Sequence, residues 1–264
     1  MTEILHLTAS ALYAVAAALG VRSLRRGGET RGVAWALWAG IVLHASAFVA
    51  LHERQPRVPL ESFPAALSLI GWMIPLSHLV AFRAARVRGV GTWVAAAASA
   101  FTGVAGGGLW LGAGAAAAPG AESPTWSHAH VLLSTLGFSL LTLTSVAGLA
   151  YLTKQRALKR NQAARFGLPS LESLDRMEHI TLSIGFLLLT LGLLTGFVWS
   201  AGRDARLWTL HSVSLVIAWG VYLVPIGLRL LSNQHGDRPA RLVVAGFGLL
   251  VFSYVGIRIL GMGA

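Results

Sequence analysis

The chain has 264 residues, of which 55% are hydrophobic and only 12% are charged. A typical soluble domain carries about 25% charged residues, so this composition excludes an ordinary soluble protein and indicates a membrane protein. The formal net charge is +11, but the Arg and Lys residues lie in short gaps between apolar runs, which argues against a nucleic-acid-binding face. Because the chain contains no cysteine, disulfides, thiolate metal ligands and covalent c-type haem attachment are also excluded.

Eight apolar runs follow one another along the chain. Each is close to the roughly 20 residues that cross the hydrocarbon layer as a helix. We therefore predict an all-α fold, a polytopic transmembrane bundle in which residues 1–264 form a single domain. The predicted spans are residues 4–21, 33–51, 63–82, 90–112, 128–153, 178–200, 209–231 and 241–261.

The basic residues divide unequally between the two sets of gaps that alternate along the chain. Sixteen of the 21 Lys and Arg residues lie in one set and five in the other. Since cytoplasmic loops carry the excess of positive charge, we predict that both termini lie outside and that the 154–177 loop lies inside. A basic cluster follows the first apolar run rather than preceding it, which predicts a retained helix and not a cleaved signal peptide. We therefore expect a multi-pass protein of the bacterial inner (cytoplasmic) membrane with periplasmic termini.

Glycine pairs at GxxxG spacing occur in two predicted helices, and such pairs let helix backbones approach closely. They are Gly103–Gly107 and Gly108–Gly112 in the fourth helix and Gly192–Gly196 in the sixth. Tight packing within one bundle is the favoured interpretation, and a dimer interface is the alternative. Pro75 and Pro225 fall inside the third and seventh helices, where we expect kinks.

Six of the nine histidines fall in the outer half of the predicted bundle or at its edge. They are His6, His44, His52, His128, His130 and His211. A ligand-binding role is one interpretation of a histidine in this position, and a hydrogen bond to a neighbouring helix is the other. His128 and His130 are two residues apart, so on a helix they point about 200° apart and at most one of them faces the bundle. His6 and His52 are expected to be solvated.

Motifs of common membrane enzymes and pumps are missing from the sequence. The chain has no HExxH, Walker or GxSxG motif, and none of its ten acidic residues falls in the middle of a predicted span. An ion-coupled transporter normally keeps an intramembrane carboxylate. These observations weaken the transporter class and favour a protein that is not an enzyme by itself.

An ordered series of short segments lies between residues 126 and 260. The segments are Trp126–Ser134, Tyr151–Lys159, Leu168–Asp175, Gly185–Gly196, Ser214–Tyr222 and Tyr254–Arg258. In this order they resemble the cytochrome c assembly protein family, to which the CcsA and CcmC proteins belong, and in particular its HemX/YpjD-like branch. The first half of the chain agrees through the number of helices and through Leu43-His44-Ala45.

The resemblance implies that the protein handles haem at the outer face of the membrane. Relatives use a tryptophan-rich loop that ends in Trp-Asp and is flanked by outer histidines, and the corresponding loop here is Trp199–Trp208. His130 takes the place of the first flanking histidine. The second position would follow the eighth helix, where Gly261–Ala264 contains no histidine. The resemblance therefore favours a haem-binding or accessory role over delivery of haem to an apocytochrome.

The cofactor implied by the resemblance is haem b, held non-covalently by imidazole ligation of its iron. His130 is the first candidate ligand. The second candidate is His211 or His44. Counted from the outer ends of the helices at ~1.5 Å of rise per residue, His130 and His211 lie ~3–5 Å deep and His44 lies ~10 Å deep. Similar depth favours His211, and the resemblance favours His44.

The outer loop that ends in Trp208 also holds Arg203 and Arg206, two of the five basic residues of the outer side. Because arginine matches carboxylate geometry with charge-assisted hydrogen bonds, these two residues are expected to bind the haem propionates. The expected partners are the lipid bilayer, haem and another membrane or cytochrome maturation protein, with no nucleic acid. The alternative function is a haem-free membrane scaffold or a regulatory subunit of a larger membrane complex.

Overall fold

The computed structural model describes residues 2–25, 31–54, 62–85, 89–111, 125–161, 167–201, 210–232 and 234–260. These residues form seven separate helices and a final helical segment made of three joined pieces. The helices are α1 Thr2–Arg25, α2 Arg31–Arg54, α3 Phe63–Ala85, α4 Gly91–Trp110, α5 Thr125–Lys159, α6 Leu171–Ala201 and α7 Leu210–Ser232. The final segment is α8 Asp237–Val251, the π-helix η2 Phe252–Gly256 and α9 Ile257–Ile259. The predicted all-α fold with eight long helices is confirmed.

Within the described part of the chain, seven of these helical segments are long and apolar enough to cross a membrane. The exception is α4, which consists largely of Ala and Gly. Apolar helices suit lipid because every backbone N–H and C=O group is hydrogen-bonded within its own segment. The protein is therefore a polytopic transmembrane helix bundle.

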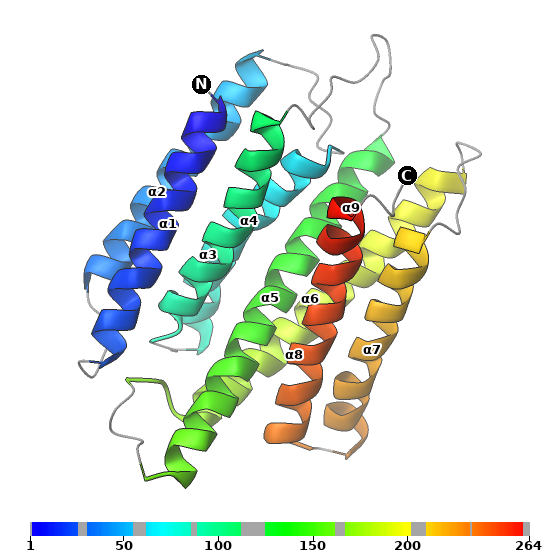
Figure 1. Ribbon diagram of the computed structural model, residues 1–264. Helices are drawn as coiled ribbons and strands as arrows, with labels where there is room; N and C mark the ends of the chain where they lie inside the picture. Colours follow the sequence, from blue (N-terminus) through cyan, green and yellow to red (C-terminus); the bar gives the residue numbers. More distant parts are fainter. Residues whose placement is uncertain are drawn as a thin grey trace.

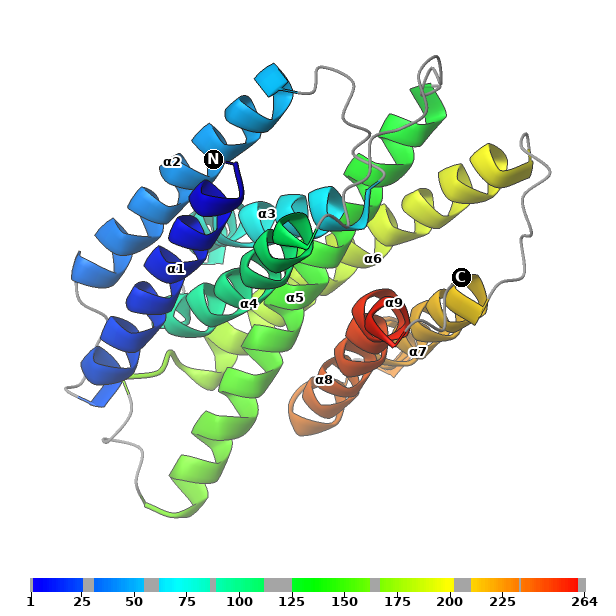
Figure 2. The same cartoon turned by 45° about the horizontal axis from the view of Figure 1, so that its top comes forward.

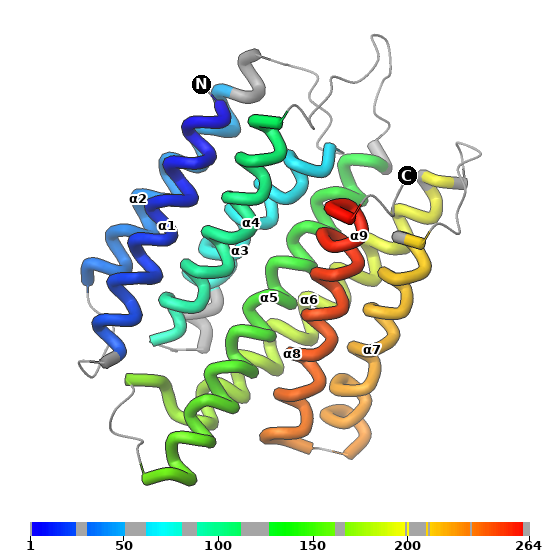
Figure 3. Tube along the Cα trace, in the orientation of Figure 1, coloured from blue at the N-terminus to red at the C-terminus, as the bar shows by residue number. Residues whose placement is uncertain are grey.

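The helices pack side by side as a series of pairs (Figure 1). Helices α1 and α2 lie at one edge, α1 contacts α4, α3 contacts both α4 and α5, and α5 pairs with α6. At the other edge α7 packs on α8, which contacts α5, and Figure 2 shows these two helices together on one side of the α5–α6 pair. Helix α1 begins and α9 ends at the same end of the bundle (Figure 3). We call this the terminal end and the opposite one the distal end.

Glycines set the close approach of α5 and α6. A Cβ atom added at Gly192 would clash with the facing side chain of α5, and one at Gly196 would lie 2.8 Å from the ring of His130. The Gly192–Gly196 pair is therefore used for packing within the bundle, which was the favoured interpretation. In α4, a Cβ at Gly107 would meet nothing within 4 Å, and Gly112 lies outside the described residues, so the role of those pairs stays a prediction.

Two helices extend furthest beyond their predicted spans. Helix α5 continues to Lys159 instead of ending at residue 153, and α6 begins at Leu171 rather than at residue 178. The added turns of α6 carry Asp175, and Glu178 lies one turn further on. Both carboxylates pair with Arg229 of α7, a partner more than fifty residues away that no local pattern reveals.

Candidate functional site

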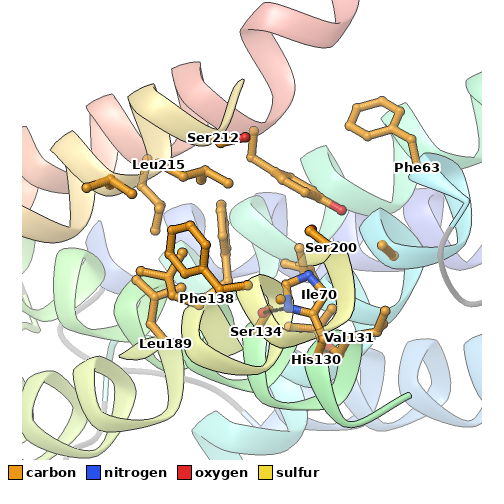
Figure 4. A pocket seen from close by; sticks show the side chains of 18 of the residues that line it. Phe63, Ile70, His130, Val131, Ser134, Phe138, Leu189, Ser200, Ser212 and Leu215 are labelled. Atoms are coloured by element: carbon orange, nitrogen blue, oxygen red, sulfur yellow. Dashed lines mark hydrogen bonds between the residues drawn. The ribbon is translucent and has the colours of Figure 1, made fainter. Parts of the chain in front are cut away.

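A cavity of about 320 Å³ lies among α3, α5, α6, α7 and the α8–η2–α9 segment (Figure 4). Phe63 at the start of α3, Ser212 near the start of α7 and Arg258 in α9 place it toward the terminal end of the bundle. Its size falls in the lower part of the range of about 300–1,000 Å³ that is usual for small-molecule sites. The aromatic lining residues are Phe63, Phe138, Phe197 and Tyr254, and the polar ones are His130, Ser134, Thr135, Ser200, Ser212 and Arg258.

His130 is the imidazole of this cavity, and the facing helix α6 determines its orientation. Its Nδ1 lies 2.7 Å from the carbonyl oxygen of Gly192. A carbonyl can only accept, so Nδ1 carries the proton, and in a neutral ring the lone pair is on Nε2. A histidine that binds a metal typically donates its other ring N–H to a carbonyl or carboxylate in this way. The tautomer of His130 therefore suits a ligand of an iron atom through Nε2.

His128 lies on the opposite face of α5 and is exposed. The prediction that at most one of these two histidines faces the bundle is confirmed, because two residues of helix rotate the side chain through about 200°. His128 is therefore close to His130 in sequence but does not line the cavity.

Arg258 gives the cavity a cation that the sequence analysis did not single out. Its guanidinium carbon lies 5.8 Å from the centroid of the Phe63 ring, within the range of a cation–π contact. Tyr254, four residues earlier, lines the same cavity, as expected for side chains one turn apart on one helix face. The four-residue spacing of Tyr254 and Arg258, within a segment that carries the family resemblance, was the feature of the sequence that could have identified Arg258.

The structure does not bring His44 to this cavity. His44 Nε2 lies 2.9 Å from the hydroxyl of Ser68 in α3. Ala66 and Ile70, two residues on either side of Ser68, line the cavity, and side chains two positions apart on a helix point to nearly opposite faces. Helix α3 therefore stands between His44 and the cavity that contains His130.

His6 corrects one expectation of the sequence analysis. The side chain is fully buried rather than solvated, because α1 packs against α2 and α4. The His6 ring also contacts the hydroxyl of Ser68 in α3 at 2.8 Å. The burial of His6 depends on helices that follow later in the sequence. The side chain of His52 lies outside the described residues.

The remaining predicted site residues cannot be placed against the cavity. Arg203, Arg206 and Trp208 lie outside the described residues, and so does the side chain of His211. The next residue, Ser212, does line the cavity. The proposed roles of Arg203, Arg206, Trp208 and His211 stay predictions.

A second group of charged residues lies toward the distal end. Arg229 of α7 donates to Asp175 at 3.0 Å and to Glu178 at 2.6 Å, and the side chains of Arg229 and Glu178 are only 2% and 1% exposed. His235 adds a contact of 3.0 Å to Asp175. Glu178 is thus a carboxylate inside the apolar span Leu171–Val198, which the sequence analysis placed at the edge of its helix. Buried charges persist when they are paired, and this group connects α6 to α7.

The sequence profile of the cytochrome c assembly protein family matches residues 34–264. The matched region contains all the helices that form the cavity and the whole series of segments between residues 126 and 260. The chain belongs to the cytochrome c assembly protein family. The match also extends the resemblance into the first half of the chain, where only the helix count and the residues around His44 pointed to it.

Several curated family members are similar to this chain. The cytochrome c biogenesis protein CcsA of Prochlorococcus marinus (strain MIT 9303) is 36% identical over 112 residues, which are 40% of this chain and 35% of the relative. CcsA of Guillardia theta is 27% identical over 162 residues, 54% of each chain. CcsA of Parasynechococcus marenigrum (strain WH8102) is 29% identical over 164 residues, 53% of this chain and 54% of the relative. The chain therefore spans about a third to a half of the length of these relatives.

Proposed function

We propose that this member of the cytochrome c assembly family holds haem b non-covalently in the cavity beside His130. The observation that carries the proposal is the position of His130. Its ring stands at the wall of an aromatic-lined cavity, and its Nδ1 donates to the carbonyl of Gly192. When bound, haem would supply an iron that accepts an imidazole nitrogen as a ligand. The protein binds and orients haem in this proposal and is not itself an enzyme.

The chemical types of the lining residues suit a haem. Phe138, Phe197 and Tyr254 offer aromatic surface to the faces of a porphyrin, His130 offers one nitrogen, and Arg258 offers a cation near the end of the bundle. Arginine pairs well with carboxylates, so Arg258 is a candidate partner of a propionate.

The second histidine that would hold the iron is proposed to be His211. Its neighbour Ser212 lines the cavity, whereas the Nε2 of His44 is engaged with Ser68 on the far face of α3. Substitution of each histidine by alanine distinguishes them. We expect His211→Ala, and not His44→Ala, to convert a low-spin spectrum to a high-spin one.

The outer loop is proposed to supply further contacts. Arg203, Arg206 and Trp208 precede α7 directly in the sequence, and Ser212 near the start of α7 lines the cavity. We propose that the two arginines bind haem propionates together with Arg258, and that Trp208 packs against the porphyrin. Replacement of both arginines by glutamine should weaken haem retention without changing expression.

The terminal end of the bundle is proposed to face the outside of a bacterial cytoplasmic membrane, with the haem near the outer leaflet. We also propose a HemX-like accessory role, in partnership with another membrane or cytochrome maturation protein.

The test is the visible spectrum of the purified protein with and without dithionite. We expect a Soret band, sharpened α and β bands on reduction, and complete extraction of the haem into acidified acetone, because the chain has no cysteine to attach it. Absence of haem bands, both as purified and after titration with hemin, would instead favour the haem-free scaffold or regulatory subunit.

A further inference from the structure

A second polar cluster lies on the face of α3 that is turned away from the cavity. It consists of His6 of α1, His44 of α2 and Ser68 of α3, and all three side chains are fully buried. The hydroxyl oxygen of Ser68 lies 2.8 Å from His6 Nε2 and 2.9 Å from His44 Nε2. Ionisable residues buried inside a membrane are costly and mark functional sites. The proposed haem function does not use this cluster.

The hydrogen-bond partners determine which ring nitrogens carry protons. His6 Nδ1 lies 2.8 Å from the carbonyl oxygen of Thr2, which can only accept, so Nδ1 is protonated. No carboxylate among the described residues contacts the His6 ring at hydrogen-bond distance, and an unpaired buried charge is expensive, so the ring is neutral. Its Nε2 therefore accepts from the hydroxyl of Ser68. Since a hydroxyl has one proton to donate, the Ser68 oxygen accepts from the Nε2–H of His44.

This assignment leaves a lone pair on His44 Nδ1. That nitrogen is buried and has no hydrogen-bond partner within the described residues, and the same holds for the hydroxyl of Tyr13. The ring centroids of Tyr13 and His44 are 6.0 Å apart. Tyr13 packs against Gly40, one turn before His44 on α2. An acceptor and a donor thus lie near each other, and each costs about 1–3 kcal/mol if it is left unsatisfied.

We propose that His44 and Tyr13 bind one water molecule, which donates to His44 Nδ1 and accepts from the hydroxyl of Tyr13. Buried waters satisfy polar groups that have no other partner, and they need two to four such groups. With the water in place, every donor in the chain points the same way: water to His44, His44 to Ser68, Ser68 to His6 and His6 to Thr2. This hydrogen-bond chain joins α2, α3 and α1, and it ends at the carbonyl of Thr2, which accepts the last hydrogen bond.

Solid-state NMR of ¹⁵N-histidine-labelled protein in lipid bilayers tests the proposal, with resonances assigned by single His→Gln substitutions. We expect a protonated Nδ1 and an unprotonated Nε2 for His6, the reverse for His44, and a cross-peak from water to the His44 ring. A protonated Nδ1 on His44, or no contact between that ring and water, overturns the proposal. The protonation states are read from the wild-type spectrum, and the variants serve only to assign its resonances.

Two variants with matched controls locate the water. Tyr13→Phe should remove the water cross-peak and shift the His44 Nδ1 resonance. Tyr222→Phe should leave both unchanged, although the hydroxyl of Tyr222 is also buried and without a partner among the described residues, because Tyr222 lies in α7. An unchanged His44 resonance in Tyr13→Phe would contradict the site. Ser68→Ala should shift His6 and His44 together, whereas Ser46→Ala, whose hydroxyl bonds only to the carbonyl of Leu43, should shift neither.

Discussion

At the scale of single residues, the orientation of His130 depends on two glycines, Gly192 and Gly196, in the facing helix α6. The ring fits against Gly196, where an added Cβ would lie 2.8 Å from both Nδ1 and Cε1, and it donates to the carbonyl of Gly192. A bulkier residue would displace the imidazole from this carbonyl and so from the tautomer and direction that suit iron ligation.

Gly196→Ala should therefore weaken haem binding and lower the free energy of unfolding by about 1–3 kcal/mol, the usual cost of overpacking. Haem content and thermal unfolding in detergent measure the two effects. Gly220→Ala is the control, because a Cβ there meets nothing within 4 Å and alanine is the better helix former. A Gly196→Ala protein with wild-type haem content and stability would show that the ring is not held in this way.

Arg258 is the described cation of the cavity, and its contribution can be measured separately. Charge-assisted hydrogen bonds contribute about 1.5–3 kcal/mol, so Arg258→Gln should weaken hemin binding by a factor on the order of ten to a hundred. Hemin titration followed at the Soret band gives the affinity. Arg241→Gln, which removes an exposed arginine paired with Asp237, should leave the affinity unchanged. Equal affinities for the wild type and the Arg258→Gln variant would remove this residue from the site.

At the scale of elements, the charged group of Arg229, Asp175 and Glu178 fastens α6 to α7. Arg229→Met leaves the buried Glu178 and the partly buried Asp175 without their arginine, which should cost about 3–5 kcal/mol of unfolding free energy. Thermal unfolding of the purified protein measures it, and the combined replacement of Asp175 by Asn and Glu178 by Gln should recover most of the loss. Arg241→Met, which breaks only an exposed pair, should change stability by no more than about 0.5 kcal/mol. A loss in Arg229→Met as small as this would show that the buried pairs do not clamp the helices.

The same elements show what a sequence reveals and what it does not. Apolar runs gave the number and order of the helices, and the 200° rotation between His128 and His130 correctly predicted that only one faces the bundle. The start of α6 was wrong, because the carboxylates of Asp175 and Glu178 are compensated by an arginine from another helix. The burial of His6 and the contribution of Arg258 to the cavity were also not predicted. Both depend on which helices pack together, and helical periodicity within one segment carries no such information.

At the scale of the whole molecule, the described chain begins and ends at one end of the bundle (Figure 3), and the charge distribution predicts that this end faces outside. The chain has no cysteine, so single cysteines can be introduced at Ser123 and at the exposed Ser170. A membrane-impermeant thiol reagent added to intact cells should label position 123 and not position 170. Labelling of position 170 alone would invert the topology.

The central claim is that His130 holds haem at the terminal end of the bundle, and a pair of visible spectra tests it most directly. His130→Ala removes the ring that lines the cavity, whereas His128→Ala removes an exposed ring from the opposite face of the same helix turn. Both proteins are purified identically, and their spectra are recorded with and without reductant. We predict that His130→Ala loses the haem bands or becomes high-spin, while His128→Ala keeps the wild-type spectrum. A wild-type spectrum in His130→Ala would contradict the proposed site, even in a protein that binds haem.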